Sequence, residues 1–329
     1  MENFSNIDGI EISYRSYGGA GKKYSVRDNG EYYLLKLPER VRQNNRDTSY
    51  ANSCITEYIS CKVIKSLGLD VQDVFLCTYN NDLVVACKDF LSKEESLGSF
   101  LELQNKVNHI NSDNKGVSLE KTLQFIKEQE VVKPDEMERY FWDMFVADAL
   151  IGNPDRHHNN WGYIFNEETN IRRMSPIYDC GASLYPILSE DEKKKFLDDS
   201  SEFNRISKND PVSIFKFNNA RMNYYHILVD NRKNNYECSN DIAEAIKRIA
   251  PKYNSEIVHA IIREIPYISH VEKEFYTQLL DNRNRLIIQK ALKNQLDRED
   301  EWKYLEENFS TSKCYKIIKE KVKNENIND

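Results

Sequence analysis

The hydrophobic pattern changes near residue 90, and this change limits the folds open to the chain more than any other feature. Apolar and polar residues alternate over 8–37 around a glycine cluster, and two shorter runs of the same kind lie at 74–78 and 83–87. Such alternation predicts strands, because successive side chains of a strand face opposite sides. From residue 91 on, most apolar residues recur at helical spacing. We expect an α+β protein with a β-rich part over 1–90 and a larger, mainly helical part over 91–329.

One helix is expected inside the β-rich part, beginning at about Thr48 or Ser49. Its apolar residues have helical spacing: Ile55, Ile59, Val63 and Leu67. Gly68 supplies the stop signal, since glycine readily takes the left-handed conformation that ends many helices.

Long helical patterns dominate the second part of the chain. Pro134 opens a helix that should stop at Gly152, because proline suits the first helical position. Further helical patterns cover 240–263 and 271–295. A pair of strands around a polar turn at 166–170 interrupts the helical part.

Composition indicates a folded, soluble chain. The 329 residues are 40% apolar and 11% aromatic, enough to form a core, and no run approaches the roughly 20 apolar residues of a membrane span. The net charge of −7 argues against a nucleic-acid coat or a polybasic membrane binder. Seven cysteines without a C-x-x-C pair signal neither a disulfide framework nor a zinc site. The N-terminus has no secretory pattern. We expect a reducing compartment, either the cytoplasm or a host cytosol reached without a signal peptide.

A polar hexapeptide follows the helix stop at Gly152: Asp155-Arg156-His157-His158-Asn159-Asn160. Phosphoryl transfer needs a carboxylate that accepts a hydroxyl proton and an oxygen ligand for magnesium, both on a loop held by rigid elements. Asp155 and Asn160 lie five residues apart, as do the Asp and Asn of the protein-kinase catalytic loop. An Asx-rich helix cap explains the hexapeptide alone equally well.

Asp179 supports the kinase interpretation of the hexapeptide. It lies nineteen residues after Asn160, past the predicted strand pair and directly before Cys180-Gly181. In protein kinases a hairpin likewise separates the catalytic-loop Asn from an Asp that ligates the metal bridging the phosphates. Alone, Asp179 is more simply a strand-ending turn residue. The order Asp155, Asn160, Asp179 favours the kinase arrangement.

Lys36 and Glu57 are candidates for a phosphate-orienting ion pair. Lys36 lies in the apolar run 34–37, where a charge on an inner face is costly unless it is paired or meets a ligand. It shares a strand face with Leu34, so a solvated lysine on an outer face is the competing interpretation. Glu57 borders the apolar face of the following helix and lies within reach of a strand lysine. A Lys–Glu pair of this kind orients the lysine toward the α- and β-phosphates.

The glycine cluster at 18–21 suits phosphate binding, because glycines let backbone N–H groups approach phosphates closely. It matches neither G-x-G-x-x-G nor G-x-x-x-x-G-K-[ST], and glycine clusters are commonly simple turns.

Taken in order over about 12–185, several segments resemble the HipA-like serine/threonine kinases. These segments are Ser16-Tyr17-Gly18-Gly19-Ala20-Gly21-Lys22-Lys23, Leu35-Lys36-Leu37-Pro38, Glu57-Tyr58 leading to Leu67-Gly68-Leu69, Lys88-Asp89-Phe90, Leu150-Ile151-Gly152-Asn153-Pro154 with the hexapeptide, and Pro176-Ile177-Tyr178-Asp179. The chain is most similar to a small stand-alone type in this family, since it begins almost at the glycine loop. The resemblance implies a two-lobed protein-kinase-like fold that uses ATP and Mg²⁺ to phosphorylate Ser or Thr hydroxyls of a protein substrate.

The resemblance also implies a role for each matching residue. Asp155 would be the catalytic base, Asn160 and Asp179 the magnesium ligands, and Lys36, with Glu57 as its partner, the phosphate-binding lysine. The remaining cofactor-binding positions would be Ser16, Gly18, Gly19, Ala20, Gly21, Lys22, Lys23, Lys88, Asp89, Phe90 and His157.

The glycine loop also bears on regulation. Ser16 falls where a longer family member autophosphorylates, which suggests a regulatory phosphoserine. The motifs depart from the family pattern at two places. In the glycine loop, Gly21 and Lys22 replace more polar or acidic residues, and in the hexapeptide Arg156 stands where some relatives have Gly.

Three further features lead to structural hypotheses. Asp148 lies on an apolar helix stripe and is expected to accept hydrogen bonds from the catalytic-loop backbone or from His157, with a solvated helix-flank acid as the alternative. The neighbouring His157 and His158 point apart, which disfavours a metal site. The lysine run 193–195 follows three acidic residues and is expected on a solvated, charge-balanced face.

Other functions compete with protein phosphorylation. A small-molecule or lipid kinase would use the same residues. A nucleotide-binding pseudokinase or interaction scaffold is disfavoured, because Lys36, Asp155, Asn160 and Asp179 are all present. A helix-turn-helix DNA binder is disfavoured by the acidic composition and the lack of a basic recognition helix. We expect an ATP- and Mg²⁺-dependent serine/threonine protein kinase without direct nucleic-acid or membrane binding.

Overall fold

The computed structural model describes residues 1–13, 23–38, 40–43, 46–49, 51–108, 117–217, 219–229 and 240–309. Most of the predicted glycine loop, Ser16, Gly18, Gly19, Ala20, Gly21 and Lys22, lies outside the described residues. None of the described helices is both long enough and apolar enough to cross a membrane.

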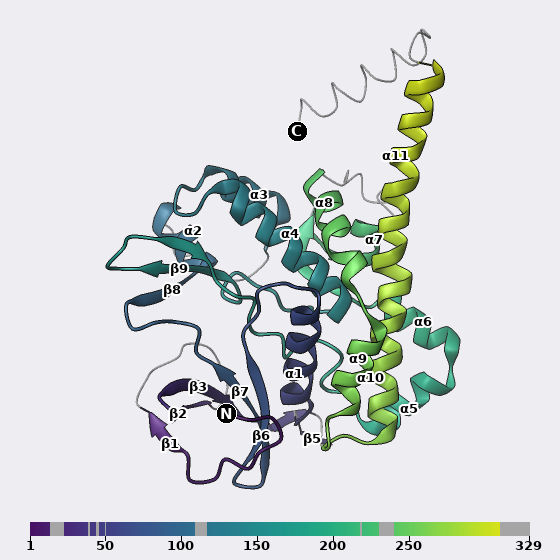
Figure 1. Cartoon of the computed structure of the whole chain (residues 1–329). Helices are drawn as coiled ribbons and strands as arrows, with labels where there is room; N and C mark the ends of the chain where they lie inside the picture. Colours follow the sequence, from purple (N-terminus) through teal and green to yellow (C-terminus); the bar gives the residue numbers. More distant parts are fainter. Residues whose placement is uncertain are drawn as a thin grey trace.

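A five-stranded antiparallel sheet with the order β1-β2-β3-β7-β6 forms the N-terminal part (Figure 1). Its strands are β1 (Glu11–Ser13), β2 (Lys23–Asp28), β3 (Glu31–Lys36), β6 (Val74–Tyr79) and β7 (Asp82–Lys88). The alternation over 8–37 thus contains three strands instead of two. Asn29 and Gly30 supply the extra turn, because both adopt the left-handed conformation of a tight hairpin. Asn80 and Asn81 form the turn between β6 and β7 in the same way.

The predicted helix of the N-terminal part is α1 (Ala51–Ser66), which packs against β6, β7 and the C-terminal helix α9 (Ser255–Arg263). It begins later than expected, because the preceding residues form a hairpin of β4 (Arg40–Gln43) and β5 (Arg46–Ser49). The predicted apolar stripe of α1 is buried, and Gly68 follows the helix with φ of +73°.

Helices form most of the C-terminal part, as predicted. They are α2 (Phe100–Asn108), α3 (Leu119–Glu128), α4 (Pro134–Ile151), α5 (Glu190–Asp198), α6 (Ser200–Lys208), α7 (Tyr224–Leu228), α8 (Asn240–Ile249), α9, α10 (His270–Arg283) and α11 (Gln289–Phe309). The 3₁₀ segment η2 (Ala250–Lys252), which contains Pro251, separates α8 from α9. A π-helical segment, η3 (Asn284–Ile288), joins α10 to α11, and α11 extends beyond the other helices (Figure 1).

Two small sheets lie within the helical part. β8 (Glu95–Ser99), β9 (Gly162–Asn166) and β10 (Arg172–Met174) form an antiparallel sheet in the order β10-β9-β8. β9 begins two residues after the polar hexapeptide, so this sheet holds the end of that loop. β11 (Val212–Phe217) and β12 (Ala220–Asn223) form a separate hairpin.

One continuous apolar core joins the two parts through α1. Leu34 packs against this core, whereas Leu35 belongs to a smaller cluster on the opposite face of the sheet. The strand face that Lys36 shares with Leu34 is therefore the inner face toward α1. The competing interpretation of Lys36 as an outer-face lysine is wrong.

The lysine run 193–195 corrects another prediction. Lys193 is fully buried and donates to Glu272 Oε1 at 2.6 Å and to Tyr276 Oη at 3.0 Å. Only Lys194 and Lys195 are exposed. The charge balance of the run does not reveal that one face of α5 packs against α10.

Candidate functional site

Lys36, Glu57 and Asp179 meet although they come from three separate elements. Lys36 Nζ donates to Glu57 Oε2 and to Asp179 Oδ1, each at 2.9 Å. Two further bonds tie α1 to the segment that follows Asp179: Cys180 N donates to Glu57 Oε1 at 2.9 Å, and Thr56 Oγ1 donates to the Gly181 carbonyl at 2.7 Å. Helix α1 therefore fixes both the lysine and the Asp179 segment.

Charge favours the ionised forms of Lys36 and Asp179. The Lys36 ammonium lowers the pKa of Asp179 to about 2, against the opposing effect of burial. Burial alone would lower the pKa of Lys36, but Glu57 and Asp179 raise it well above its usual value. The Asp179 side chain is still 46% exposed, so it presents a carboxylate to solvent at neutral pH. Its φ of +59° is a left-handed conformation that Asp tolerates better than most residues.

The polar hexapeptide is a hydrogen-bonded loop at the end of α4. Gly152 ends the helix in a left-handed conformation. Asn153 Oδ1 accepts from the Asp155 backbone N–H at 3.0 Å. Asn160 Nδ2 donates to the Asp155 carbonyl at 2.9 Å, which closes the loop and brings the two candidate residues together. Tyr224 Oη, from the start of α7, donates to the Asn153 carbonyl at 2.7 Å.

The Asp155 carboxylate is 53% exposed at the surface of this loop. Partial burial raises its pKa, as does the charge of Asp179, while His157 and Arg156 act in the opposite direction. His157 Nε2 lies 4.0 Å from Asp155 Oδ2. A nearby exposed cation, Arg221 of β12, also lowers the pKa of Asp155.

Arg156 is the main site residue that the sequence analysis failed to assign. It is fully buried, and its Nε and Nη2 atoms donate to Asp148 Oδ2 and Oδ1 at 2.9 and 3.0 Å. Nη1 donates to the Asn160 carbonyl at 2.8 Å and also to the Tyr178 carbonyl. One guanidinium therefore joins the catalytic-loop candidate Asn160 to the residue before Asp179.

Asp148 does anchor the loop, but not through the expected donors. It is 1% exposed, and its carboxylate accepts from Arg156 and from Asn153 Nδ2 at 3.1 Å, not from His157 or the loop backbone. The signal was present in the sequence: a carboxylate on an apolar stripe needs a cation, and Arg156 lies just beyond the helix stop.

The two histidines of the loop have different surroundings. His158 is buried, its ring lies 4.7 Å from that of Phe100, and its Nε2 is 3.0 Å from Thr122 Oγ1. Burial lowers the pKa of His158 to about 3, so it is neutral at physiological pH. His157 instead lies beside Asp155.

The hinge that connects β7 to the helical part contains Lys88, Asp89 and Phe90, which the resemblance implies as cofactor-binding residues. The Lys88 and Asp89 N–H groups donate to the Asp73 and Tyr32 carbonyls at 2.8 and 2.9 Å. Among the described residues, no acceptor takes the Phe90 N–H. The Phe90 ring lies 6.0 Å from that of Tyr178. Lys23 is the register partner of Lys36 on β2, and its charge helps to lower the pKa of Asp179.

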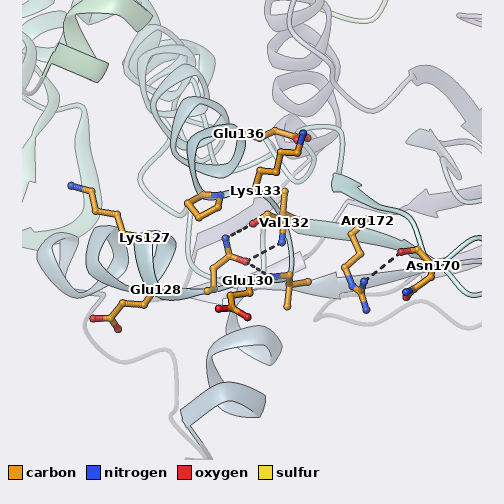
Figure 2. Close-up of a pocket in the computed structure, with 11 residues that line it drawn as sticks. Lys127, Glu128, Glu130, Val132, Lys133, Glu136, Asn170 and Arg172 are labelled. Carbon is orange, nitrogen blue, oxygen red and sulfur yellow. Dashed lines mark hydrogen bonds between the residues drawn. The ribbon is translucent and has the colours of Figure 1, made fainter.

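A hollow of about 580 Å³ lies elsewhere, between the α3–α4 connection and the β9–β10 turn (Figure 2). Its labelled residues carry both signs of charge, with Lys127, Lys133 and Arg172 near Glu128, Glu130 and Glu136. It contains none of the predicted site residues, and we assign it no role.

The antiparallel sheet with its single helix, the Lys–Glu–Asp triad and the Asp–Asn loop define a protein-kinase-like fold. A family model described as the HipA-like C-terminal domain matches residues 15–265, and the chain belongs to this family. The sequence is 38% identical over 279 residues to the serine/threonine-protein kinase CtkA of Helicobacter pylori strain J99, covering 84% of each chain. The crystal structure of the Helicobacter pylori proinflammatory kinase CtkA aligns with a TM-score of 0.82 and 36% identity, over 90% of this chain and 98% of that one.

These comparisons confirm the resemblance and the α+β kinase-like fold. The chain is a serine/threonine-protein kinase homologue, related over most of its length to CtkA.

Proposed function

We propose that this protein transfers the γ-phosphate of ATP to Ser or Thr hydroxyls of a protein substrate, at a site between lobes of residues 1–90 and 91–329. The observation that carries the proposal is the position of Lys36, which contacts Glu57 and Asp179 at 2.9 Å each. A kinase requires this lysine pair and the metal-binding Asp to be in place together. Here the Lys36 ammonium lies within hydrogen-bond distance of both carboxylates.

In this proposal Asp155 receives the proton of the acceptor hydroxyl. Its carboxylate is half exposed, so a substrate side chain can reach it, and the surrounding loop bonds fix its position. Lys36 binds the α- and β-phosphates, and Glu57 keeps the lysine charged and oriented. Positioning and charge neutralisation supply most of the rate enhancement in such reactions.

Asn160 and Asp179 fit a magnesium site. Both offer oxygen ligands, which Mg²⁺ prefers. Asn160 uses its amide nitrogen on the Asp155 carbonyl, and no described residue donates to its Oδ1. The low pKa of Asp179 keeps that carboxylate ionised. Bound Mg²⁺ would neutralise phosphate charge as it develops.

The remaining assignments follow the same proposal. Adenine would meet the hinge at Lys88, Asp89 and Phe90, where the Phe90 N–H is available among the described residues. The phosphates would meet the glycine loop with Lys23, and His157 would lie beside them. We further propose autophosphorylation at Ser16. A role as a toxin or virulence factor acting in a host cytosol is supported by the similarity to a proinflammatory kinase. The five cysteines among the described residues are buried and free, which suits a reducing compartment.

The test is phosphate transfer from γ-labelled ATP to protein, peptide, lipid and metabolite acceptors offered in parallel. Asp155→Asn and Asp179→Ala should each abolish incorporation into Ser and Thr of protein acceptors. Full activity in either variant would contradict the assigned roles. Label that enters only lipids or metabolites would contradict the protein substrate while leaving the phosphotransferase chemistry in place.

A further inference from the structure

Glu57, Cys61 and Cys180 form a buried cluster of metal-ligating side chains behind the proposed phosphate site. Glu57 and Cys61 are four residues apart on α1 and therefore share a helix face. Cys180 directly follows Asp179. All three are no more than 1% exposed. One ligand atom from each lies within 4.8 Å of the other two.

The contacts within this thiol–carboxylate cluster leave one carboxylate oxygen directed at the sulfurs. Glu57 Oε2 accepts a hydrogen bond from Lys36 Nζ. Glu57 Oε1 accepts the Cys180 N–H and lies 3.9 Å from Cys61 Sγ. The Cys180 thiol is close enough to Cys61 to raise the pKa of the Cys61 thiol, as burial also does. Arg156 Nη2 donates to Cys180 Sγ at 3.4 Å. Thiols form weak hydrogen bonds, so the two sulfurs are held less firmly than the Glu57 carboxylate.

We propose that the thiol–carboxylate cluster is a binding site for a thiophilic divalent cation of the zinc class, and that its occupancy lowers kinase activity. The cation binding stands by itself, whereas the effect on activity rests on the proposed function. Binding replaces two thiol protons: Zn²⁺ and two S–H groups give a zinc dithiolate and two released protons, with Glu57 as the third ligand. No oxidant or reductant takes part.

The geometry of the cluster suits such an ion. Three atoms no more than 4.8 Å apart all lie within about 2.8 Å (4.8 Å divided by √3) of a common point. Zinc takes thiolate sulfur at about 2.3 Å and carboxylate oxygen at about 2.0–2.2 Å. Each ligand atom must therefore move inward by less than 1 Å. Magnesium prefers oxygen ligands, which distinguishes this cluster from the oxygens of Asn160 and Asp179.

Occupancy would disturb the proposed phosphate site in two ways. A dication on Glu57 Oε1 weakens the attraction of that carboxylate for the Lys36 ammonium, which now lies 2.9 Å from Oε2. It also displaces the Cys180 N–H from Oε1, and this bond holds the residue next to Asp179 against α1. Both Lys36 and Asp179 would then lose a positioning contact, so phosphate transfer should slow.

Cadmium titration of the reduced full-length chain tests the binding. Cadmium is a zinc-class ion whose bonds to thiolates absorb in the ultraviolet, so the readout does not depend on activity. The wild type should take up one equivalent with a thiolate-to-cadmium absorption that Cys61→Ser, Cys61→Ala and Cys180→Ser lose. Cys77→Ser is the matched control, because Cys77 is equally buried but lies on β6 beside Ser5. The two Cys61 variants keep the test interpretable if Cys180→Ser does not fold.

Zinc titration of kinase activity tests the consequence, with each variant compared with its own metal-free rate. Saturating Zn²⁺ should reduce the wild-type and Cys77→Ser rates at least tenfold, reversibly with a chelator, and leave the Cys61 variants within twofold. Absence of the cadmium equivalent, its retention in the Cys61 variants, or equal zinc inhibition in every chain would overturn the proposal. Conversion of Cys61 and Cys180 to a disulfide without metal uptake would do the same. Inactivity of the metal-free wild type would instead contradict the proposed function, and the cadmium result would still stand.

Discussion

In the buried pair of Asp148 and Arg156, the arginine side chain holds two loops together. The Arg156 guanidinium is fully buried between the polar hexapeptide and the segment before Asp179, and it donates to both. The charge of Asp148 raises the pKa of Arg156 well above its usual value in spite of burial, so the pair is ionised. Removing one member of a buried ion pair leaves the other charge without compensation.

We therefore predict that Arg156→Gln lowers the free energy of unfolding by about 3–5 kcal/mol. It should also reduce phosphate transfer more than tenfold at temperatures where the variant is folded, because Asn160 and Asp179 lose their common anchor. Urea unfolding and initial rates measure the two effects. Arg173→Gln is the control, since Arg173 forms a partly exposed pair with Glu95 at 3.2 Å and should cost about 0–1 kcal/mol. Equal effects of the two substitutions would show that Arg156 has no special role.

The buried ring of His158 should make the folded chain less stable in mild acid. Its pKa is about 3 in the folded chain, because burial disfavours the charged ring, and about 6.5 when unfolded. Between these values the unfolded chain binds the proton and the folded chain does not, so stability is complete above pH 6.5 and falls as the pH drops toward 3. At pH 5 this effect is about 2 kcal/mol, from 1.36 kcal/mol per pH unit.

His158→Gln should therefore lose less stability than the wild type between pH 7.5 and pH 5, by about 2 kcal/mol. Urea unfolding at the two pH values gives the difference directly. Glutamine can still hydrogen-bond Thr122, which now lies 3.0 Å from the ring. His270→Gln serves as the control, because the His270 side chain is 93% exposed. An unchanged pH dependence in His158→Gln would show that another group controls the acid response.

Among the elements, α4 positions the polar hexapeptide through the way the helix ends at Gly152. Gly152 has φ of +64°, and a Cβ atom there would lie 2.3 Å from Arg283 Nη1. That guanidinium cannot easily move away, because it is buried and donates to the Ile151 carbonyl at 2.7 Å. The glycine is therefore required both by its backbone conformation and by the close approach of α10.

Gly152→Ala should be more destabilising than Gly30→Ala, which has a similar φ of +85° but no atom within 4 Å of its added Cβ. The left-handed conformation costs about 1–2 kcal/mol in both variants. The clash with Arg283 adds about 1–3 kcal/mol in the first alone. Only Gly152→Ala should also slow phosphate transfer, since Asp155 follows three residues later. Matching unfolding midpoints for the two variants would argue against the contact with Arg283.

Local pattern predicted the elements that combine a long apolar stripe with a clear stop, such as α1 and α4. It missed β8, whose residues Glu95–Ser99 are largely polar and form a strand by pairing with β9 far along the chain. It also missed the burial of Lys193, which depends on Glu272 and Tyr276 of another helix. The order of Lys36, Glu57, Asp155, Asn160 and Asp179 was visible in the sequence. The Asp148–Arg156 pair was visible only in part: the carboxylate on an apolar stripe called for a donor, but no periodicity across the helix end singles out Arg156.

At the scale of the whole molecule, α1 contacts both parts of the chain and also the candidate site, so it links the position of the two parts to the geometry of the site. The helix packs on the sheet and on α9, its Glu57 binds Lys36, and its Thr56 binds Gly181. A nucleotide that bridges Lys36 and Asp179 would thus bind to groups that α1 holds together in the folded chain. Because the unfolded chain has no such site, the nucleotide should stabilise the folded chain by an amount set by its affinity.

A non-hydrolysable ATP analogue with Mg²⁺, at a hundred times its dissociation constant, should raise the free energy of unfolding by about 2.7 kcal/mol. Asp155→Asn should keep this increase, because the proposed function places Asp155 at the acceptor hydroxyl and not at the nucleotide. Lys36→Met should lose most of it at the same analogue concentration, since the phosphates lose their cation. Measuring each variant with and without the analogue removes the change that the substitution itself makes in stability. If Lys36→Met kept the full increase, the nucleotide would bind elsewhere. If Asp155→Asn lost the increase, Asp155 would take part in nucleotide binding instead of proton transfer.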